Sequence, residues 1–117
     1  MIVKILLILY SSVTTNFSSF FIIIRLSFGP DLFPYKAAFI DQYTSRETAS
    51  SIVKKIKKVV LSDFKGVIHV GAERKTVFEY ALSTGATDID PISIHDMNVK
   101  MPIDTSLNTS LYKSTIE

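Results

Sequence analysis

The sequence predicts an α/β fold with few short strands and about three helices. Residues 20–24 form a continuous apolar run of β-branched and aromatic side chains, which is typical of a strand covered on both faces. An amphipathic helical segment follows at residues 48–61. Residues 66–71 are a second β-branched run, and glycines bound it. Strand, helix and strand in this order indicate the α/β class.

Length and composition describe a small globular domain. The 117 residues carry 47% hydrophobic and 21% charged side chains, which excludes a disordered composition. A net charge of +2 gives no general argument for binding nucleic acid or an anionic membrane, and we expect neither partner. Cysteine is absent, which excludes disulfides and thiolate metal sites and is compatible with a reducing cytoplasm, where we expect the protein.

Residues 1–19 are an ambiguous apolar segment before the main domain, which we assign to residues 20–117. The run at 5–10 behind Lys4 resembles a short signal-peptide core, although no small-x-small cleavage site follows. Polar residues at 11–16 interrupt any stretch of about 20 apolar residues that could span a bilayer. Three interpretations stay open: a buried helix or strand, a signal or anchor, and disorder.

The central helix is predicted to begin at a capping box. Thr44 and Glu47 have the required spacing, and Ser45 is an alternative cap. The predicted buried face consists of Ala49, Ile52, Val53, Ile56 and Val60. The basic side chains at 54, 55, 57 and 58 are interpreted as a solvated helix face, because the other basic residues are scattered.

Further elements follow the strand at 66–71. His69 is interpreted as a structural histidine, since no partner pattern for a proton relay or a metal site lies nearby. Thr76 is predicted to cap a second helix, and residues 92–94 are a candidate strand. Asp104 is predicted to cap a short final helix that contains Leu107, Leu111 and Tyr112.

Four stretches resemble sugar-nucleotide reductases related to dTDP-dehydrorhamnose reductase, within the extended short-chain dehydrogenase/reductase superfamily. The run Asp-Gln-x-Thr-Ser at 41–45 is similar to the Asp-Gln and Thr-Ser/Ala stretch before a helix in that family. Residues 22–30 resemble its strand that ends in arginine and an aromatic residue. The Gly-Val-Ile-His-Val-Gly run at 66–71, with the helix at 76–81, and Asp-Thr-Ser at 104–106 follow in the family's order.

The resemblance implies a partial Rossmann-type fold, equivalent to the C-terminal, substrate-binding segment of an NAD(P)-dependent reductase or epimerase. The glycine-rich cofactor loop, Gly-x-x-Gly-x-x-Gly, has no match among the four glycines, and no tyrosine has a lysine four residues on. The resemblance therefore implies no catalytic residues and no cofactor bound by this chain alone. The implied partner is a nucleoside-diphosphate sugar. The alternative is a stand-alone nucleotide-sugar binding or scaffold module, which would pair with a dinucleotide-binding domain encoded separately.

Six residues are candidates for contact with such a ligand. Arg25 and Ser27 are expected at the carboxyl end of the first strand, where open α/β sheets bind ligands. Arg46 is expected in the first helical turn, where a cation opposes the helix dipole. Phe28 and Phe33, with Tyr35, form a ledge over a sugar or base or else seal a core. Arg74, with Lys75, is placed to hold a diphosphate at a helix N-terminus or else is solvated.

Overall fold

The computed structural model describes residues 2–10 and 20–117. Three α-helices and a short 3₁₀ helix occur in these ranges: α1 (Ala49–Leu61), α2 (Val77–Ser83), η1 (Ile94–Asp96) and α3 (Ser110–Thr115). The strands are β1 (Ile2–Tyr10), β2 (Phe20–Gly29), β3 (Ala37–Phe39), β4 (Tyr43–Thr44), β5 (Glu47–Thr48), β6 (Gly66–Val70), β7 (Lys75–Thr76) and β8 (Asp90–Ile92).

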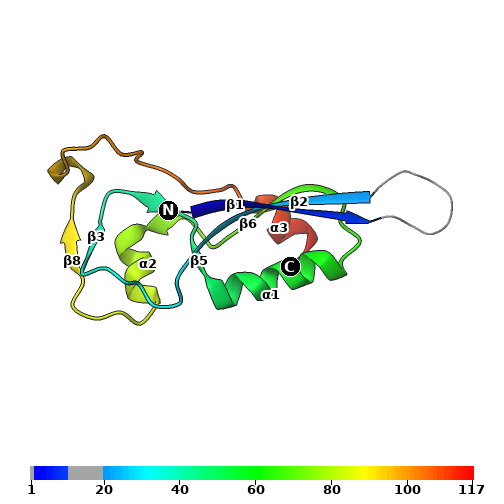
Figure 1. Ribbon diagram of the computed structural model, residues 1–117, viewed down its shortest axis with the longest axis horizontal. Helices are drawn as coiled ribbons and strands as arrows, with labels where there is room; N and C mark the ends of the chain where they lie inside the picture. The colour runs from blue at the N-terminus through cyan, green and yellow to red at the C-terminus, as the bar shows by residue number, and fades with distance from the viewer. Residues whose placement is uncertain (1, 11–19) are drawn as a thin grey trace.

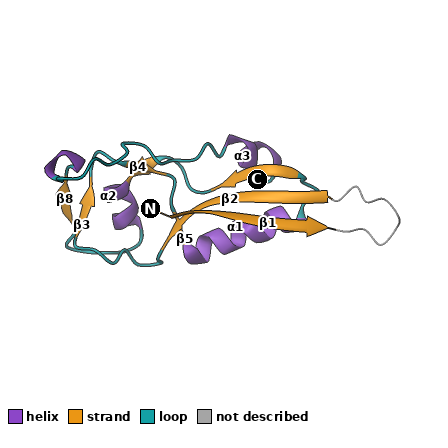
Figure 2. Cartoon of the chain, turned by 45° about the horizontal axis from the view of Figure 1, so that its top comes forward, coloured by secondary structure: helices purple, strands orange, loops and turns teal. Residues whose placement is uncertain are grey.

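The main sheet is built around β2. Strand β1 pairs with it antiparallel over its length, from Ile2 opposite Phe28 to Tyr10 opposite Phe20. Strands β5 and β6 both run parallel to β2, so the carboxyl ends of these three strands lie at one edge of the sheet. Figure 1 shows this sheet beside α1, and Figure 2 shows the same arrangement turned toward the viewer.

Helix α1 covers one face of the main sheet. Alternate side chains of β2 and β6 pack under it because successive residues of a strand point to opposite faces. The resulting core consists of Ile22, Ile24, Leu26, Ile52, Val59, Ile68, Val70 and Tyr112. These side chains are at most 6% exposed, so they supply the main hydrophobic stabilisation of this half of the molecule.

A second, smaller core lies beyond the carboxyl end of β2. Its buried residues are Phe33, Ala38, Val77, Tyr80 and Ala81, contributed by β3, α2 and the loop between β2 and β3. Two small sheets accompany this core. In one of them β3 pairs parallel with β8, and in the other β4 pairs antiparallel with β7. Figure 1 shows α2, β3 and β8 together, away from α1.

The start of the central helix differs from the prediction. The cap is Thr48, whose hydroxyl accepts from the backbone N–H of Ser51 at 3.4 Å, so the prediction of a cap at Thr44 or Ser45 is wrong. Thr44 and Ser45 are fully buried, and Ser45 Oγ accepts from the backbone N–H of Leu107 at 2.8 Å. The Thr44 hydroxyl accepts from the backbone N–H of Arg46 at 3.1 Å, so a local turn and a tertiary contact occupy the two hydroxyls that were expected to cap the helix.

The buried face of α1 also differs from the predicted one. Ile52 and Val59 are its buried residues, whereas Val53 is 62% exposed. Including Val53 in the buried face was therefore wrong. The seven-residue spacing of Ile52 and Val59 marks a narrow line of contact with the sheet.

Two other boundary predictions are corrected. Strand β2 continues to Gly29, so Arg25 lies in mid-strand and not at the carboxyl end. Helix α3 begins at Ser110, and Asp104 is not its cap. Asp104 instead accepts hydrogen bonds from the backbone N–H and the hydroxyl of Ser106, which close a local turn.

The α/β class and the three α-helices are confirmed for the described residues. Part of the ambiguous N-terminal segment is strand β1, while the polar run predicted at 11–16 lies outside the described residues. The candidate strand at 92–94 is correct only at Ile92, where β8 ends before η1. No helix within the described ranges has the length and apolar character needed to cross a membrane.

Candidate functional site: a mixed-charge cavity at the sheet's carboxyl edge

A cavity of about 310 Å³ opens at the carboxyl ends of β5 and β6. Parallel strands place their last residues at the same edge, and ligands of open α/β sheets bind there. The lining residues come from three separate stretches of the sequence, 47–55, 71–75 and 109–117: Glu47, Lys55, Gly71, Ala72, Glu73, Lys75, Thr109, Tyr112, Lys113 and Glu117.

Close backbone packing forms the wall of this cavity. The backbone N–H of Ala72 donates to the carbonyl of Ser45 at 2.7 Å. A Cβ atom on Gly71 would lie 2.6 Å from the same carbonyl oxygen, so only glycine fits between β6 and the segment before β5. The contact fixes residues 71–73 against the end of the sheet.

Lys55 connects the helix to this edge. Its Nζ donates to the carbonyl of Gly71 at 3.0 Å and lies 2.8 Å from Oε2 of Glu47. The ammonium group also lies 5.7 Å from the centroid of the Tyr112 ring. Lys55 is therefore partly buried and held by three groups, unlike the exposed lysines at 54, 57 and 58.

Two further lysines reach the cavity from other elements. Lys113 of α3 forms an ion pair with Glu73, and this hydrogen bond is the main reason that the pKa of Glu73 lies below its ordinary value. Lys75 of β7 lies 5.8 Å from the centroid of the Tyr80 ring and contributes more weakly to the same lowering. With Lys55, three ammonium groups and three carboxylates surround the cavity.

Tyr112 adds a hydroxyl that has no hydrogen-bond partner among the described residues. The side chain is 1% exposed. Burial raises the pKa of Tyr112, and the carboxylates of Glu117 and Glu47 raise it further. The hydroxyl therefore stays protonated at neutral pH, which makes it a hydrogen-bond donor and excludes it as a general base.

The six predicted ligand residues do not gather around one site, and none of them lines this cavity. Arg25 is exposed on the sheet, where its Nη1 lies 3.4 Å from Nε2 of His69. The other ring nitrogen of His69 donates to the carbonyl of Asn108 at 3.1 Å, so this histidine is held on both sides. Ser27 is fully buried inside β2.

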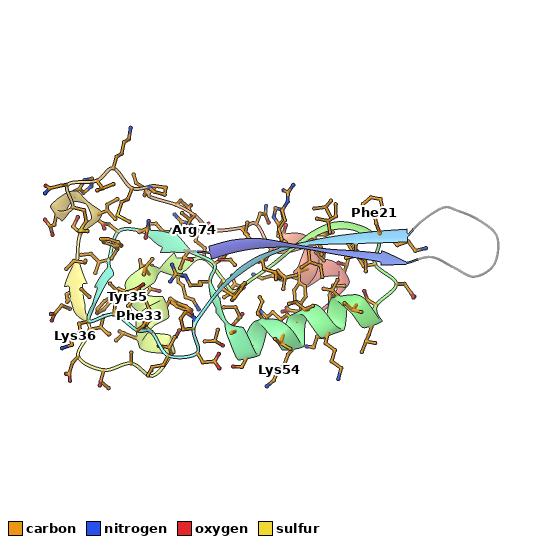
Figure 3. All side chains as sticks on the ribbon, in the orientation of Figure 1. Phe21, Phe33, Tyr35, Lys36, Lys54 and Arg74 are labelled. Carbon is orange, nitrogen blue, oxygen red and sulfur yellow. The ribbon has the colours of Figure 1, made fainter. Side chains whose placement is uncertain are left out.

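The aromatic residues considered for a ledge, Phe28 in β2 and Phe33 and Tyr35 in the loop after it, do not form a common surface. Phe28 is half-buried and packs against the core under α1. Phe33 is 6% exposed and belongs to the second core, where it meets the rings of Tyr35 and Tyr80 edge-on. Figure 3 shows Phe33 and Tyr35 close together beside α2. For Phe33, sealing the core is the correct alternative.

Arg46 lies before β5 and not inside the first turn of α1 as predicted. Its guanidinium carbon lies 5.2 Å from the centroid of the Tyr80 ring, and its Nε is buried with no partner among the described residues. Burial lowers the pKa of Arg46 from its ordinary value. A Cβ on Gly29 would lie 2.7 Å from Cδ of Arg46, so the glycine at the end of β2 leaves room for this side chain.

Arg74 is occupied by protein groups. Its Nε donates to Oδ2 of Asp104 at 3.0 Å, and its guanidinium carbon lies 3.8 Å from the centroid of the Tyr43 ring. Both contacts turn Arg74 away from its neighbours Glu73 and Lys75, which line the cavity. Of the pair considered for a diphosphate, only Lys75 lies at the site.

Most residues of the cavity carry no functional signal in the sequence. The sequence predicts Lys55 among the solvated lysines, Glu47 in a helix cap and Tyr112 in the final helix. One signal was present in the sequence: Lys55 and Ile52 are three residues apart, so the lysine borders the buried line of α1. Distant residues such as Lys113 carried no such signal.

No cluster of three or more His, Cys, Asp or Glu side chains suitable for a metal ion occurs in the described part of the chain. Comparison with known proteins gave no match to a family model, to a curated protein or to a solved structure.

Proposed function

We propose that this chain binds a nucleoside-diphosphate sugar in the cavity at the carboxyl edge of the sheet. The observation that carries the proposal is the convergence of Lys55, Lys75 and Lys113, from three different elements, on one cavity of about 310 Å³. Ammonium groups bind phosphate oxygens through charge-assisted hydrogen bonds.

The carboxylates of the cavity define how such a ligand would bind. Glu47 and Glu73 neutralise Lys55 and Lys113, so a diphosphate would have to compete with both ion pairs. Lys75 forms no salt bridge among the described residues and contacts the Tyr80 ring instead. Lys75 is therefore the ammonium group most available to a phosphate, and the glutamates are acceptors for sugar hydroxyls.

The proposed context is an NAD(P)-dependent sugar-nucleotide reductase or epimerase, in which this chain supplies the substrate-binding segment. The support is the order of the four sequence stretches together with the strand–helix–strand unit β2–α1–β6, whose two strands are parallel. The glycine-rich loop and the tyrosine–lysine pair are absent from this sequence, so the dinucleotide-binding half of such an enzyme would lie outside these 117 residues. We expect no hydride transfer by this chain alone, since the cofactor would not be positioned.

A stand-alone binding module is the second candidate. One observation favours it: β1 pairs with β2 along the whole strand, so the sheet gains its fourth strand from within the chain. In that case the cavity binds the nucleotide sugar, and a separately encoded dinucleotide-binding domain would pair with this module.

Ligand-dependent stabilisation of the purified chain tests the binding proposal, because a ligand that binds only the folded state raises the melting temperature by mass action. Nucleoside-diphosphate sugars should raise it, whereas glucose alone should not. Lys75→Met should weaken the affinity about tenfold, the value of one charge-assisted hydrogen bond. Lys54→Met is the matched control, since Lys54 is exposed on the outer side of α1 (Figure 3), and it should have no effect.

Three outcomes separate the alternatives. Equal stabilisation by inorganic phosphate and by the nucleotide sugar would contradict a nucleotide-sugar site. Binding that is unchanged in Lys75→Met would place the ligand elsewhere. Oxidation of NADPH by the purified chain in the presence of a dTDP-keto-sugar would contradict the expectation that it cannot transfer hydride alone.

A further inference from the structure

Only one face of the main sheet is covered by a described helix. Most side chains of β2 and β6 that point away from α1 remain accessible: Phe21 is 43% exposed and Val67 is 41% exposed, whereas Ser27 near the end of β2 is fully buried. Ile23 and His69 are half-buried, and Arg25 is exposed. Figure 3 shows Phe21 on the side of the sheet away from α1, while Lys54 projects from the far side of that helix.

The residues of this face lie side by side because of the strand register. Ile23 is opposite Val67 and Arg25 is opposite His69 in the parallel pairing of β2 with β6. A shallow cavity of about 250 Å³ continues the surface past the edge of β6, between Val67, His69 and Leu111. We define the open face by these residues: Phe21, Ile23, Arg25, Val67, His69 and Leu111.

The amino-acid sequence of β2 is that of a strand covered on both faces. Residues 20–24 are apolar without alternation, which parallel strands show when helices pack on both sides of the sheet. Burying Phe21, Ile23, Val67 and Leu111 would remove apolar surface from water at roughly 25 cal/mol per Å². Helices are the elements that cover the faces of parallel sheets.

The charge of the open face defines the partner further. Arg25 is its only permanently charged residue, and it contacts a histidine nitrogen but no carboxylate among the described residues. A second copy of this chain would bring two Arg25 side chains together on such a surface, which is unfavourable. A carboxylate on the partner would instead form a bidentate pair with the guanidinium.

We propose that the open face is a docking surface for an amphipathic helix of another protein, whose apolar stripe covers Phe21, Ile23 and Val67 and whose central carboxylate pairs with Arg25. The cavity beside Leu111 receives one apolar anchor side chain of that helix. The proposal does not depend on the ligand proposed for the cavity at the carboxyl edge, because the two sites share no residue.

A displayed library of single helices, randomised on one surface and selected against the full chain, tests this proposal. The enriched helices should carry apolar residues at i, i+3, i+4 and i+7 around an Asp or Glu. Arg25→Glu and Val67→Glu should each weaken their binding more than about tenfold, since they affect an ion pair and an apolar contact at the centre of the interface. Val53→Glu is the matched control on the outer surface of α1, where Val53 is 62% exposed, and it should leave binding unchanged.

A charge reversal completes the test. Replacing the acidic residue of an enriched helix with lysine should restore its binding to the Arg25→Glu variant. The proposal fails if enriched helices have no acidic preference, if they bind Val67→Glu as tightly as the unchanged chain, or if no helix is enriched. It also fails if the chain sediments as a dimer that Val67→Glu dissociates, since a second copy would then be the occupant.

Discussion

Asp41 ties the chain before β4 to the turn at η1. Its carboxylate accepts from the hydroxyl of Ser93 at 2.5 Å and from the backbone N–H of Ile94 at 2.9 Å. The hydrogen bond from Ser93 is the largest cause of a lowered pKa for Asp41, and the bond from Ile94 is the next. A single carboxylate thus joins two segments that are about 50 residues apart in the sequence.

The lowered pKa predicts how stability depends on pH. Because the folded-state pKa of Asp41 lies below the ordinary value of 3.8, its contribution is complete above that value and is lost as the pH falls through the folded-state pKa. We expect Asp41→Asn to be less stable than the unchanged chain at pH 7, and the difference to shrink below about pH 4. Urea denaturation from pH 7 to pH 2.5 measures this.

Asp63→Asn is the control for that experiment, since Asp63 is exposed. Its stability should follow that of the unchanged chain at every pH. A constant difference between Asp41→Asn and the unchanged chain across the whole range would show that the carboxylate charge has no role in the contact.

At the scale of single elements, α1 shows what a periodic pattern can and cannot predict. The helix and its amphipathic character were predicted correctly, because apolar residues recur at helical spacing over 13 residues. Its cap was predicted wrongly, since Thr44, Ser45 and Thr48 are all competent caps and the sequence alone does not select among them. The cap of α3 was predicted wrongly because this helix begins at Ser110, well after Asp104.

Two neighbouring residues of α1 provide a direct test of the observed contact line. Ile52 is 3% exposed and Val53 is 62% exposed. Ile52→Ala should lower the free energy of unfolding by about 2–5 kcal/mol, because it leaves a cavity under the helix. Val53→Ala should change it by no more than about 0.5 kcal/mol. Chemical denaturation of both variants measures the difference, and equal losses would contradict the observed orientation of the helix.

At the scale of the whole molecule, two cores meet at glycines that end strands of the main sheet. Gly71 touches Ser45, and Gly29 makes room for Arg46, whose guanidinium packs on Tyr80 of the second core. The cavity at the carboxyl edge depends on the same junction. The sequence could predict the strand edge but not the cavity, because its lining extends from Glu47 to Glu117 and is assembled only by tertiary folding.

The junction predicts a difference between two glycine substitutions. In Gly71→Ala the new Cβ would lie 2.6 Å from a backbone oxygen, so this variant should lose more stability than the roughly 1–3 kcal/mol of ordinary overpacking. In Gly85→Ala the Cβ meets no atom within 4 Å, and the cost is only the backbone strain at φ +88°, about 1–2 kcal/mol. Thermal and urea denaturation compare the two. A Gly71→Ala variant as stable as Gly85→Ala would mean that Gly71 does not lie in close contact with the backbone of Ser45.

The antiparallel pairing of β1 with β2 has a consequence for any two-chain assembly. The flank of β2 opposite β6 is already hydrogen-bonded to the chain's own first strand, from Ile2 to Tyr10. A strand of another chain could pair with β2 on that flank only by strand exchange. The nine residues of β1 would have to detach from β2 before the new strand could pair. Association through the exposed face of the sheet needs no such exchange and leaves the pairing of β1 with β2 intact.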